Sequence, residues 1–473
     1  MELAMPVKLT FLGATRNVTG SRYLLETPGD RILVDCGLFQ EREFAARNWE
    51  PFSVPPASVD AILLTHAHLD HCGLIPKFCR EGFRGNIYCT SATTEIAKIM
   101  LLDAAKLQEE DAEFKRRRHE REGRRGPYPE IPLYTVADAE ASLVHFSNQV
   151  RYAAPVRLSD QVEASFYDAG HVLGSAMIQV RASNGAEERT ILFSGDVGRW
   201  HIPILRNPTS FSQADYIIVE STYGDRQHGD QQDIAHNLAE IVNATYQAGG
   251  NIVIPSFALE RAQEVLYYLN QLLLSNRIPH LPVFLDSPMA INVTEIFKAH
   301  PESYDQDMAQ LIKLNKSPFE FPGLKMTETV DDSKAINRVS GTAVIIAGSG
   351  MCTGGRIKHH LVQNISRHES TILFVGYQAR GTLGRQIVDG SKEVRILGQY
   401  YPVRARIAQI SGFSAHADKN ELMKWLSAFE EPPKQLFVTH GEPEVASSFG
   451  EQVRKKLGWQ VSIPEYESQV TLD

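Results

Sequence analysis

The 473-residue sequence lacks three features, and each absence narrows the range of functions. No run approaches the roughly 18 consecutive apolar residues of a membrane-spanning helix, so no membrane partner is expected. The five cysteines form no CxxC pair, which disfavours a disulfide framework and favours a reducing compartment. Positive charge is not in excess, because the formal net charge is −9. This charge argues against a protein that coats nucleic acid over its whole surface, but not against a nuclease with basic groups in one cleft.

The length exceeds what one ordinary hydrophobic core accommodates, so two structural units are expected. Hydrophobic residues make up 43% of the chain and charged residues 22%, which is typical of a soluble globular enzyme. The N-terminus has no basic region followed by an apolar core. We therefore expect no secretory signal peptide and a cytoplasmic location.

The pattern of apolar residues changes along the chain. The first 200 residues contain short strand-like runs, several of them apolar throughout, which is typical of strands buried on both faces. These runs are residues 7–12, 31–34, 61–65, 191–194 and 216–220. Further on, amphipathic helices alternate with strands, which predicts βαβ units on a mostly parallel sheet. The helices are residues 234–248 and 258–275, and the strands are residues 251–255, 282–285, 343–347 and 371–376.

Residues 115–127 form a segment dense in lysine and arginine, which follows an expected helix. One interpretation is a flexible basic flap over a nucleic-acid cleft. The other is a solvated surface loop, because glutamates dilute the positive charge. The sequence leaves both open.

The strongest signal in the sequence is a group of metal-ligating residue types at the end of an apolar strand: His66, His68, Asp70 and His71. Neutral imidazole and carboxylate are ligands that suit zinc. His66 and His68 alternate onto one side of the chain and can face one metal, whereas the next two follow a turn and can face a second. The alternative is a polar loop that caps a helix. It is disfavoured, because a cap needs one Asp or Ser rather than three histidines.

Further polar residues follow strand-like segments, namely Asp35, His171 and Asp196. Together with the histidine-rich group, their order and spacing resemble the four motifs of the metallo-β-lactamase superfamily. That resemblance implies an α/β fold, the αββα sandwich of this superfamily, and a two-zinc site. In the superfamily, one zinc is held by the residues that match His66, His68 and His171. The other is held by those that match Asp70 and His71, and the residue that matches Asp196 bridges both. The residue that matches Asp35 orients one of the metal ligands.

Three more residues narrow the resemblance to one branch of the superfamily. Glu220, His416 and His440 look like motifs A, B and C of the β-CASP branch, whose known members process nucleic acids. The chain is most similar to bacterial and archaeal homologues of the endonuclease subunit of the cleavage and polyadenylation specificity factor. The resemblance covers nearly the whole chain and implies a discontinuous metallo-β-lactamase domain, residues 1–205 and 393–473, interrupted by an α/β β-CASP domain at 206–392. Homodimers are common among similar proteins.

Motif C indicates the substrate. A histidine such as His440 is typical of the RNA-cutting members, whereas DNA-repair members similar to Artemis usually carry valine. By the same resemblance, His440 is the remaining ligand of the second zinc. We therefore expect a zinc-dependent ribonuclease that acts on single-stranded RNA, although manganese could also support activity. Endonuclease and 5′→3′ exonuclease action are not distinguished.

The expected chemistry follows from two divalent ions close together, which activate water for attack on phosphorus. The catalytic residues would be Asp70, Asp196, Glu220 and His416. His416 is the candidate acid for the leaving 3′ oxygen, and Glu220 would orient it and raise its pKa. Products should carry a 5′ phosphate and a 3′ hydroxyl.

Residues in the insert are candidates for holding the RNA. Helix starts and glycine-rich loops present backbone N–H groups that favour phosphate. For the serines and glycine the alternative is an ordinary helix cap or tight turn, whereas for the arginines binding is favoured because the insert must hold an anionic strand. The candidates are Ser256, Arg261, Ser349, Gly350, Met351 and Arg356.

The sequence is also compatible with three other functions. A small-molecule hydrolase, such as a lactamase or thioesterase, could use the same metals, but the large insert argues against it. A non-catalytic RNA-binding scaffold would have lost metal ligands, whereas here every expected ligand is present. A DNA nuclease is disfavoured mainly by His440.

Overall fold

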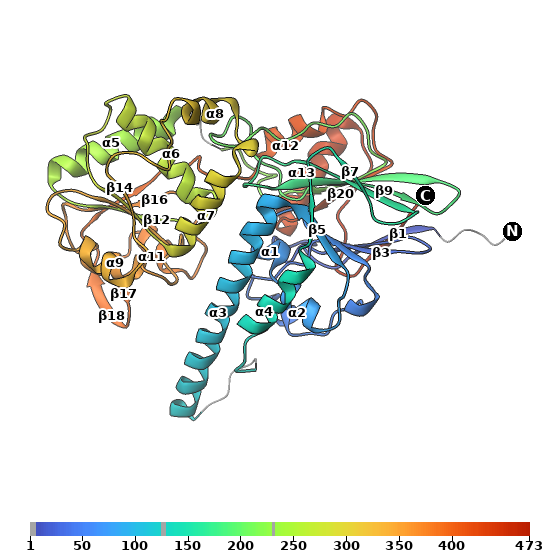
Figure 1. Cartoon of the computed structure of the whole chain (residues 1–473), viewed down its shortest axis with the longest axis horizontal. Helices are drawn as coiled ribbons and strands as arrows, with labels where there is room; N and C mark the ends of the chain where they lie inside the picture. The colour runs from blue at the N-terminus through green and yellow to red at the C-terminus, as the bar shows by residue number, and fades with distance from the viewer. Residues whose placement is uncertain (1–5, 124–128, 229–231) are drawn as a thin grey trace. The chain divides into compact units, whose positions relative to one another are not determined.

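The computed structural model describes residues 6–123, 129–228 and 232–473 (Figure 1). They form two compact units. The first contains the chain up to Trp200, Asn207–Gln227 and His416–Asp473, and the second contains His201–Arg206 and His228–Ala415. The boundary expected near residue 392 falls inside the second unit. The reason is that β19 (Arg406–Gln409) pairs with β16 (Thr371–Phe374) and completes the sheet of that unit.

The first unit contains two seven-stranded sheets that pack face to face. Their apolar side chains point into one shared core, and alternate residues of β1 and β8 are buried there, as a half-buried strand requires. In spatial order, the first sheet is β22 (Gln469–Leu472), β1 (Val7–Phe11), β2 (Tyr23–Glu26), β3 (Arg31–Val34), β4 (Ala61–Leu63), β5 (Asn86–Thr90) and β6 (Asn148–Val150). The second is β21 (Val461–Ser462), β20 (Gln435–Thr439), β11 (Tyr216–Glu220), β10 (Glu188–Phe193), β9 (Ala176–Ser183), β8 (Val162–Asp168) and β7 (Pro155–Arg157).

Helices cover the outer face of each sheet in this unit. On the second sheet, a separate apolar cluster joins the strands to Trp425 of α12 (Lys419–Leu426) and Phe449 of α13 (Pro443–Leu457). The predicted αββα sandwich is therefore confirmed. The helices of the first sheet are α1 (Leu69–Cys72), α2 (Ile75–Arg80), α3 (Ser91–Glu122) and α4 (Val136–Ser142), with 3₁₀ turns at Ala45–Asn48, Pro56–Ser58 and Leu143–His145. In the described part of the chain, no helix has the length and apolar character needed to cross a membrane.

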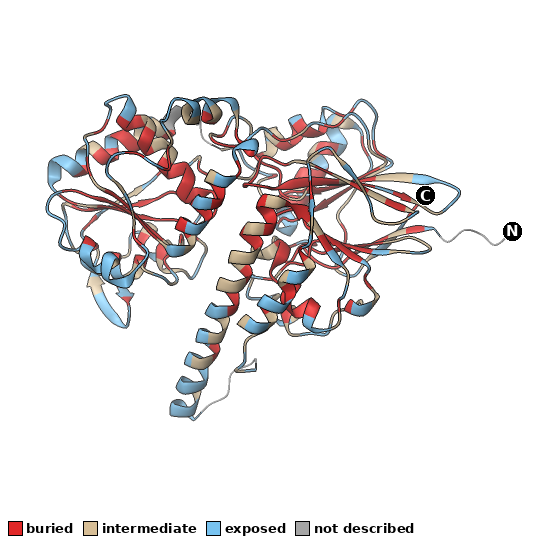
Figure 2. Ribbon diagram, in the orientation of Figure 1, coloured by how far each residue is buried: buried red, intermediate tan, exposed pale blue. Residues whose placement is uncertain are grey.

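The basic segment near residue 115 continues helix α3 as far as Glu122, and this end of the helix is exposed (Figure 2). Its charges pair within the helix: Lys115 with Asp111, and Arg118 with Glu122. Such pairs one turn apart stabilise a solvent-exposed helix. They also reduce the net positive charge that a basic flap would present. Residues 124–127 of this segment lie outside the described residues.

The second unit is built on one six-stranded sheet in which all strands are parallel, as the alternating pattern predicted. The sheet order is β14 (Leu324–Met326), β13 (Val283–Asp286), β15 (Val344–Ala347), β12 (Ile252–Pro255), β16 and β19, with a separate hairpin of β17 (Glu393–Ile396) and β18 (Gln399–Pro402). The helices are α5 (Gln232–Ala248), α6 (Arg261–Leu274), α7 (Pro288–Ala299), α8 (Gln306–Lys313), α9 (Val330–Ile336), α10 (Ile357–Asn364) and α11 (Leu383–Val388), and a 3₁₀ turn spans Pro301–Ser303.

The candidate site residues of the first unit follow parallel strands. Strands β3 and β4 pair in parallel, and Asp35 and His66 come just after their carboxyl ends. Strands β10, β11 and β20 also pair in parallel, and Asp196, Glu220 and His440 come at their carboxyl ends. Neighbouring parallel strands end at the same edge of a sheet, so each sheet brings its own polar residues together.

The loop that carries His171 depends on a glycine, which generates a first prediction. Gly174 has φ +80°, and an added Cβ would lie 2.7 Å from the Thr93 nitrogen and 2.8 Å from the Ala92 Cβ. We expect Gly174→Ala to lower the free energy of unfolding by about 2 kcal/mol or more, through left-handed strain and overpacking. Gly185→Ala is the matched control, because Gly185 has φ +88° with nothing within 4 Å. Equal losses in urea unfolding would show that close packing around Gly174 is unimportant.

Candidate metal centre

Four predicted ligands form one tight group. The Nδ1 of His68 lies 3.0 Å from the Nε2 of His66 and 3.3 Å from the Nε2 of His171. The Oδ2 of Asp196 lies 3.4 Å from the Nε2 of His66 and 3.5 Å from the Nε2 of His171. Three loops far apart in the sequence thus present these ligand atoms to one point.

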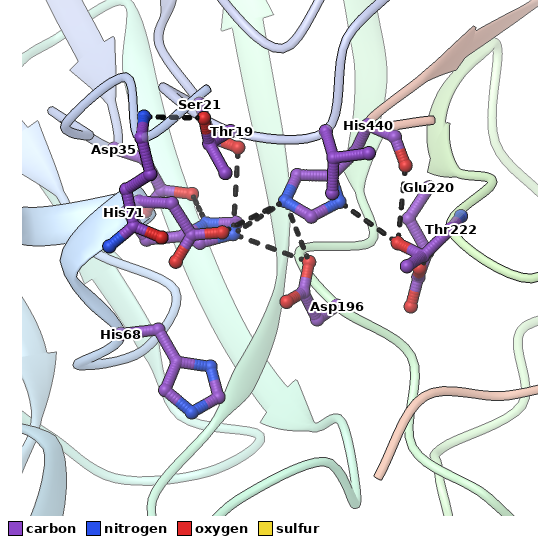
Figure 3. Close-up of polar contacts among 12 residues, drawn as sticks. Thr19, Ser21, Asp35, His68, His71, Asp196, Glu220, Thr222 and His440 are labelled. Atoms are coloured by element: carbon purple, nitrogen blue, oxygen red, sulfur yellow. Dashed lines mark hydrogen bonds and ion pairs between the residues drawn. The ribbon is translucent and has the colours of Figure 1, made fainter. Parts of the chain in front are cut away.

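A second group lies against the first (Figure 3). The Nε2 of His71 lies 3.2 Å from the Nε2 of His440 and 3.3 Å from the Oδ1 of Asp196. The Nε2 of His440 lies 3.4 Å from the Oδ2 of Asp70 and 3.6 Å from the Oδ1 of Asp196. Asp196 therefore turns a different carboxylate oxygen toward each group.

The spacing of these atoms fits two tetrahedral metal sites. Zinc bound at about 2.0–2.1 Å by four ligands requires ligand atoms roughly 3.3 Å apart. The distances between ligand atoms given above are 3.0–3.5 Å in the first group and 3.2–3.6 Å in the second, and both ranges include that value. In addition, the buried Oδ1 of Asp196 has no hydrogen-bond donor among the described residues, although a buried carboxylate oxygen needs one or a cation. The residues present could thus hold two divalent ions.

Asp35 orients the ring of His71 by contacting the nitrogen that faces away from the second group. Its Oδ2 accepts a hydrogen bond from the Nδ1 of His71 at 2.7 Å, while its Oδ1 accepts one from the Thr65 backbone N–H at 2.8 Å. A proton held on Nδ1 leaves the lone pair on Nε2, which faces the candidate metal position. Asp35 is 1% exposed and has φ 60°, so the surrounding structure holds it in a strained conformation for this contact.

Thr222 orients His440 in the same way, and sequence reasoning assigned it no role. Its Oγ1 lies 3.0 Å from the Nδ1 of His440, so the Nε2 of that ring faces the second group (Figure 3). The backbone N–H of His440 also donates to the carbonyl of Ala14 at 2.7 Å. Thr222 lies two residues after Glu220, and only its proximity to motif A could have drawn attention to it.

Burial and neighbouring charge divide the ligand histidines into two classes. Burial and the neighbouring His71 lower the pKa of His66 to about 3, and burial also lowers the pKa values of His68 and His171. For His71 and His440 burial opposes protonation, but nearby carboxylates, above all Asp196, outweigh it and raise both pKa values. The first group therefore offers uncharged rings, whereas a metal in the second group must displace protons.

An acid–base pair lies beside the two groups. The Nδ1 of His416 lies 3.2 Å from both carboxylate oxygens of Glu220 and 3.9 Å from the Oδ2 of Asp196. Glu220 is buried, and its Oε1 also accepts the Val197 backbone N–H at 2.7 Å. Burial alone would lower the pKa of His416, but the charges of Glu220 and Asp196 raise it to about 9.

The residues expected to bind RNA in the second unit are mostly engaged in its own structure. Arg356 donates to Asp286 at 2.7 Å and to the carbonyls of Thr327 and Glu328. Arg261 forms a 2.5 Å ion pair with Glu264 and is 9% exposed. Each guanidinium group therefore has a carboxylate partner within the unit, which leaves less of its charge for an RNA strand.

The serines and the glycine-rich loop lie at the carboxyl ends of the parallel strands β12 and β15. The hydroxyl of Ser349 accepts the N–H groups of Thr353 and Gly354, so it organises its own loop. Gly350 lies beneath an exposed aromatic ring, because an added Cβ would be 2.7 Å from the Phe257 ring. Ser256 donates to the carbonyl of Phe257, and the carbonyl of Met351 accepts the N–H of Gly384.

Sequence comparisons relate three parts of the chain to protein families. Residues 16–176 match the metallo-β-lactamase superfamily, and residues 262–387 match the β-CASP domain. Residues 400–464 match a family described as a Zn-dependent metallo-hydrolase RNA specificity domain. These matches cover segments of both compact units.

Relatives match over nearly the full length of the chain. Ribonuclease TTHA0252 of Thermus thermophilus is 38% identical, over 97% of this chain and 99% of that protein. Transcription termination factor FttA of Methanocaldococcus jannaschii is 30% identical, over 97% of this chain and 70% of that protein. Among solved structures, a protein of unknown function from Enterococcus faecalis has a TM-score of 0.56 at 12% identity, over 99% of this chain and 100% of that chain, which shows a shared fold.

The contact between Asp35 and His71 generates a second prediction. We expect Asp35→Asn to weaken metal binding at the second group by about 10–100-fold and to leave the first group nearly unchanged, because the oriented ring loses its charged acceptor. Titration of zinc against a competing chelator measures both affinities. Asp60→Asn is the control, because that exposed carboxylate accepts the Arg31 backbone N–H at 2.8 Å and is not among the candidate ligands. Unchanged affinity at both groups would contradict this role of Asp35.

The two histidine classes generate a third prediction, for metal content against pH. Since the pKa values of His71 and His440 are raised, protons compete for the second group already at mildly acidic pH. Since those of His66, His68 and His171 are lowered, protons compete for the first group only at lower pH. Dialysis from about pH 8 to about pH 5, followed by metal analysis, should show one ion lost before the other. Simultaneous loss of both ions would contradict the two classes.

Proposed function

Because this chain belongs to the metallo-β-lactamase superfamily and carries its β-CASP domain, we propose that it is a zinc-dependent ribonuclease that hydrolyses single-stranded RNA. The observation that carries this proposal is the position of the Glu220–His416 pair, 3.9 Å from the shared carboxylate of the two ligand groups. A relative named as a ribonuclease and the match to an RNA specificity domain support RNA as the substrate. A protonated acid beside two divalent ions is suited to phosphodiester hydrolysis, because the acid can protonate the leaving oxygen and the ions offset the charge on the phosphate.

The proposed cofactor is a pair of zinc ions. One ion would be held by His66, His68 and His171, and the other by Asp70, His71 and His440. Asp196 would contact both ions, because its two oxygens face different groups. When bound, such a pair lowers the pKa of water and offsets the charge on the phosphate oxygens. Asp35 and Thr222 then keep two ligand rings in the required tautomer.

His416 serves as the general acid in this proposal. Its Nδ1 contacts Glu220, so in this proposal the proton that it donates to the substrate is the one on the opposite nitrogen, Nε2. Water attacks the phosphorus and releases one proton to the solvent, the bond from phosphorus to the 3′ oxygen breaks, and His416 protonates that oxygen. Asp70 and Asp196 would act in this reaction by holding the ions. The products are then a 5′ phosphate and a 3′ hydroxyl. A side chain that is 21% exposed lets His416 reach the substrate while Glu220 stays buried.

The fourth prediction is cleavage of a 5′-labelled single-stranded RNA by the zinc-loaded protein, with less or no cleavage of the matching DNA. His68→Ala should abolish cleavage, because it removes one ligand of the first group. Analysis of the ends should show 5′ phosphate and 3′ hydroxyl, and the fragment pattern distinguishes endonuclease from exonuclease action. Cyclic phosphate or 5′-hydroxyl ends would exclude the mechanism. If the protein does not cleave RNA but turns over a chromogenic ester or lactam, a small-molecule hydrolase is favoured. If the purified protein contains no metal and is inactive, a non-catalytic RNA-binding scaffold is favoured.

The fifth prediction concerns the Glu220–His416 pair. His416→Ala should lower kcat by about 100–10,000-fold with unchanged zinc content, as expected for loss of a general acid. The reaction needs protonated His416, so activity should fall as pH rises through its pKa. Glu220→Gln removes the charge that raises this pKa and should move the alkaline limb to lower pH. An unchanged alkaline limb, with zinc content confirmed, would assign the proton donation to another group.

A further inference from the structure

The last turns of helix α3 carry two large apolar side chains in contact with solvent. Leu107 is 56% exposed and Phe114 is 63% exposed. Seven residues make nearly two turns of an α-helix, so the two side chains lie on the same face, about 10 Å apart along the axis. This end of α3 extends beyond the neighbouring helix α4 (Figure 1) and is exposed (Figure 2). Leu107 and Phe114 therefore form an apolar stripe on an exposed helix face.

Residues 129–136 support the other side of the same turns. The side chain of Gln108 accepts the Leu133 backbone N–H at 3.1 Å, His119 contacts Glu130, and Ala112 between them is buried. At 100° per residue, these supported positions on the helix lie about 100° or more around the axis from the apolar stripe. The first unit thus holds this part of α3 in place and leaves the apolar stripe uncovered.

The charges on these turns form two blocks of opposite sign. Residues 109–113 contain four acidic side chains, residues 115–118 are all basic, and Phe114 lies between the two blocks. A nucleic acid or an anionic membrane would be attracted by the basic block and repelled by the acidic one. A second copy of the helix in antiparallel orientation places each block beside the block of opposite charge. The order of charges therefore fits a second copy of this chain.

The geometry of the helix determines which charges would meet. In an antiparallel pair with a two-fold axis at Phe114, residues at similar distances before and after Phe114 lie opposite each other. Glu110 and Arg117 project on one side of the apolar stripe, and Asp111 and Arg118 project on the other. Glu110 would therefore face Arg117 of the second copy, and Asp111 would face Arg118. The two Phe114 rings would meet at the axis.

Ion pairs within α3 compete with these contacts, but only weakly. Three basic side chains pair with acidic side chains about one turn away: Lys115 with Asp111, Arg117 with Glu113, and Arg118 with Glu122. Exposed pairs at this spacing contribute only about 0.2–0.5 kcal/mol each. The side chains can therefore turn toward a second copy at little cost. Burial of the apolar stripe of both copies favours that exchange.

We propose that the face of α3 formed by the apolar stripe and its flanking charges binds the same face of a second copy, with the two helices antiparallel. The face contains none of the candidate metal ligands, so the proposal is independent of the proposed activity. The contact involves about four turns of helix from each copy. Interfaces of such limited size are weak, so we expect a dissociation constant of roughly 10–100 µM.

The test is sedimentation velocity of the zinc-loaded full chain at about 1–200 µM, a range that includes this constant. Glu110→Arg and Arg117→Glu each place like charges opposite each other at two symmetric contacts. Each variant alone should therefore dimerise about tenfold more weakly than wild type. In an equimolar mixture of the two variants, the mixed dimer again pairs opposite charges at both contacts, so dimerisation should recover. Both side chains are exposed, so neither change should affect folding.

Arg116→Glu is the matched control, because Arg116 is exposed but lies about 160° around the helix axis from Phe114. This change should leave dimerisation unaltered, whereas Phe114→Asp should abolish it without a change in thermal unfolding. A wild-type protein that stays monomeric over the whole range would overturn the proposal. A dimer that persists in every variant would assign the interface to another surface. Failure of the mixture to recover would exclude the antiparallel pairing.

Discussion

The carboxylate of Asp196 is the contact on which the rest of the site depends. It is 2% exposed, and its two oxygens lie among the ring nitrogens of His66, His171, His71 and His440 at 3.3–3.6 Å. Burial alone would raise its pKa, but the surrounding histidines hold it well below its usual range. One short side chain therefore joins two ligand groups and also lies within 3.9 Å of the candidate acid His416.

The fold brings these residues together through two sets of parallel strands. Three strands of one sheet end at Asp196, Glu220 and His440, and two strands of the other end at Asp35 and His66. The two sheets share one apolar core, so side-chain packing fixes the position of one sheet edge relative to the other. The metal ligands themselves are not needed for this. Hydrogen bonds between Asp35 and His71 and between Thr222 and His440 then fix the orientation of these two rings. The fold of the polypeptide thus positions the ligand atoms of both groups.

Periodicity and residue type are local signals, and they predicted the parallel sheet and the group of histidines after a strand. The αββα sandwich was expected from the resemblance to the metallo-β-lactamase superfamily. The sequence could not show that Asp196 presents separate oxygens to two groups, since this depends on pairing of strands distant in sequence. Thr222 was missed because a single threonine is uninformative without its neighbour in space. The contact between Arg356 and Asp286, 70 residues away, could not be predicted for the same reason.

The most direct test of the two-metal centre is diffraction at the zinc absorption edge from crystals of the zinc-loaded protein. We expect two anomalous peaks, one among His66, His68 and His171 and one among Asp70, His71 and His440. Each peak should contact a different oxygen of Asp196. A single peak, or one ion bound by both oxygens of Asp196, would contradict the bridging role and with it the proposed arrangement of the reaction.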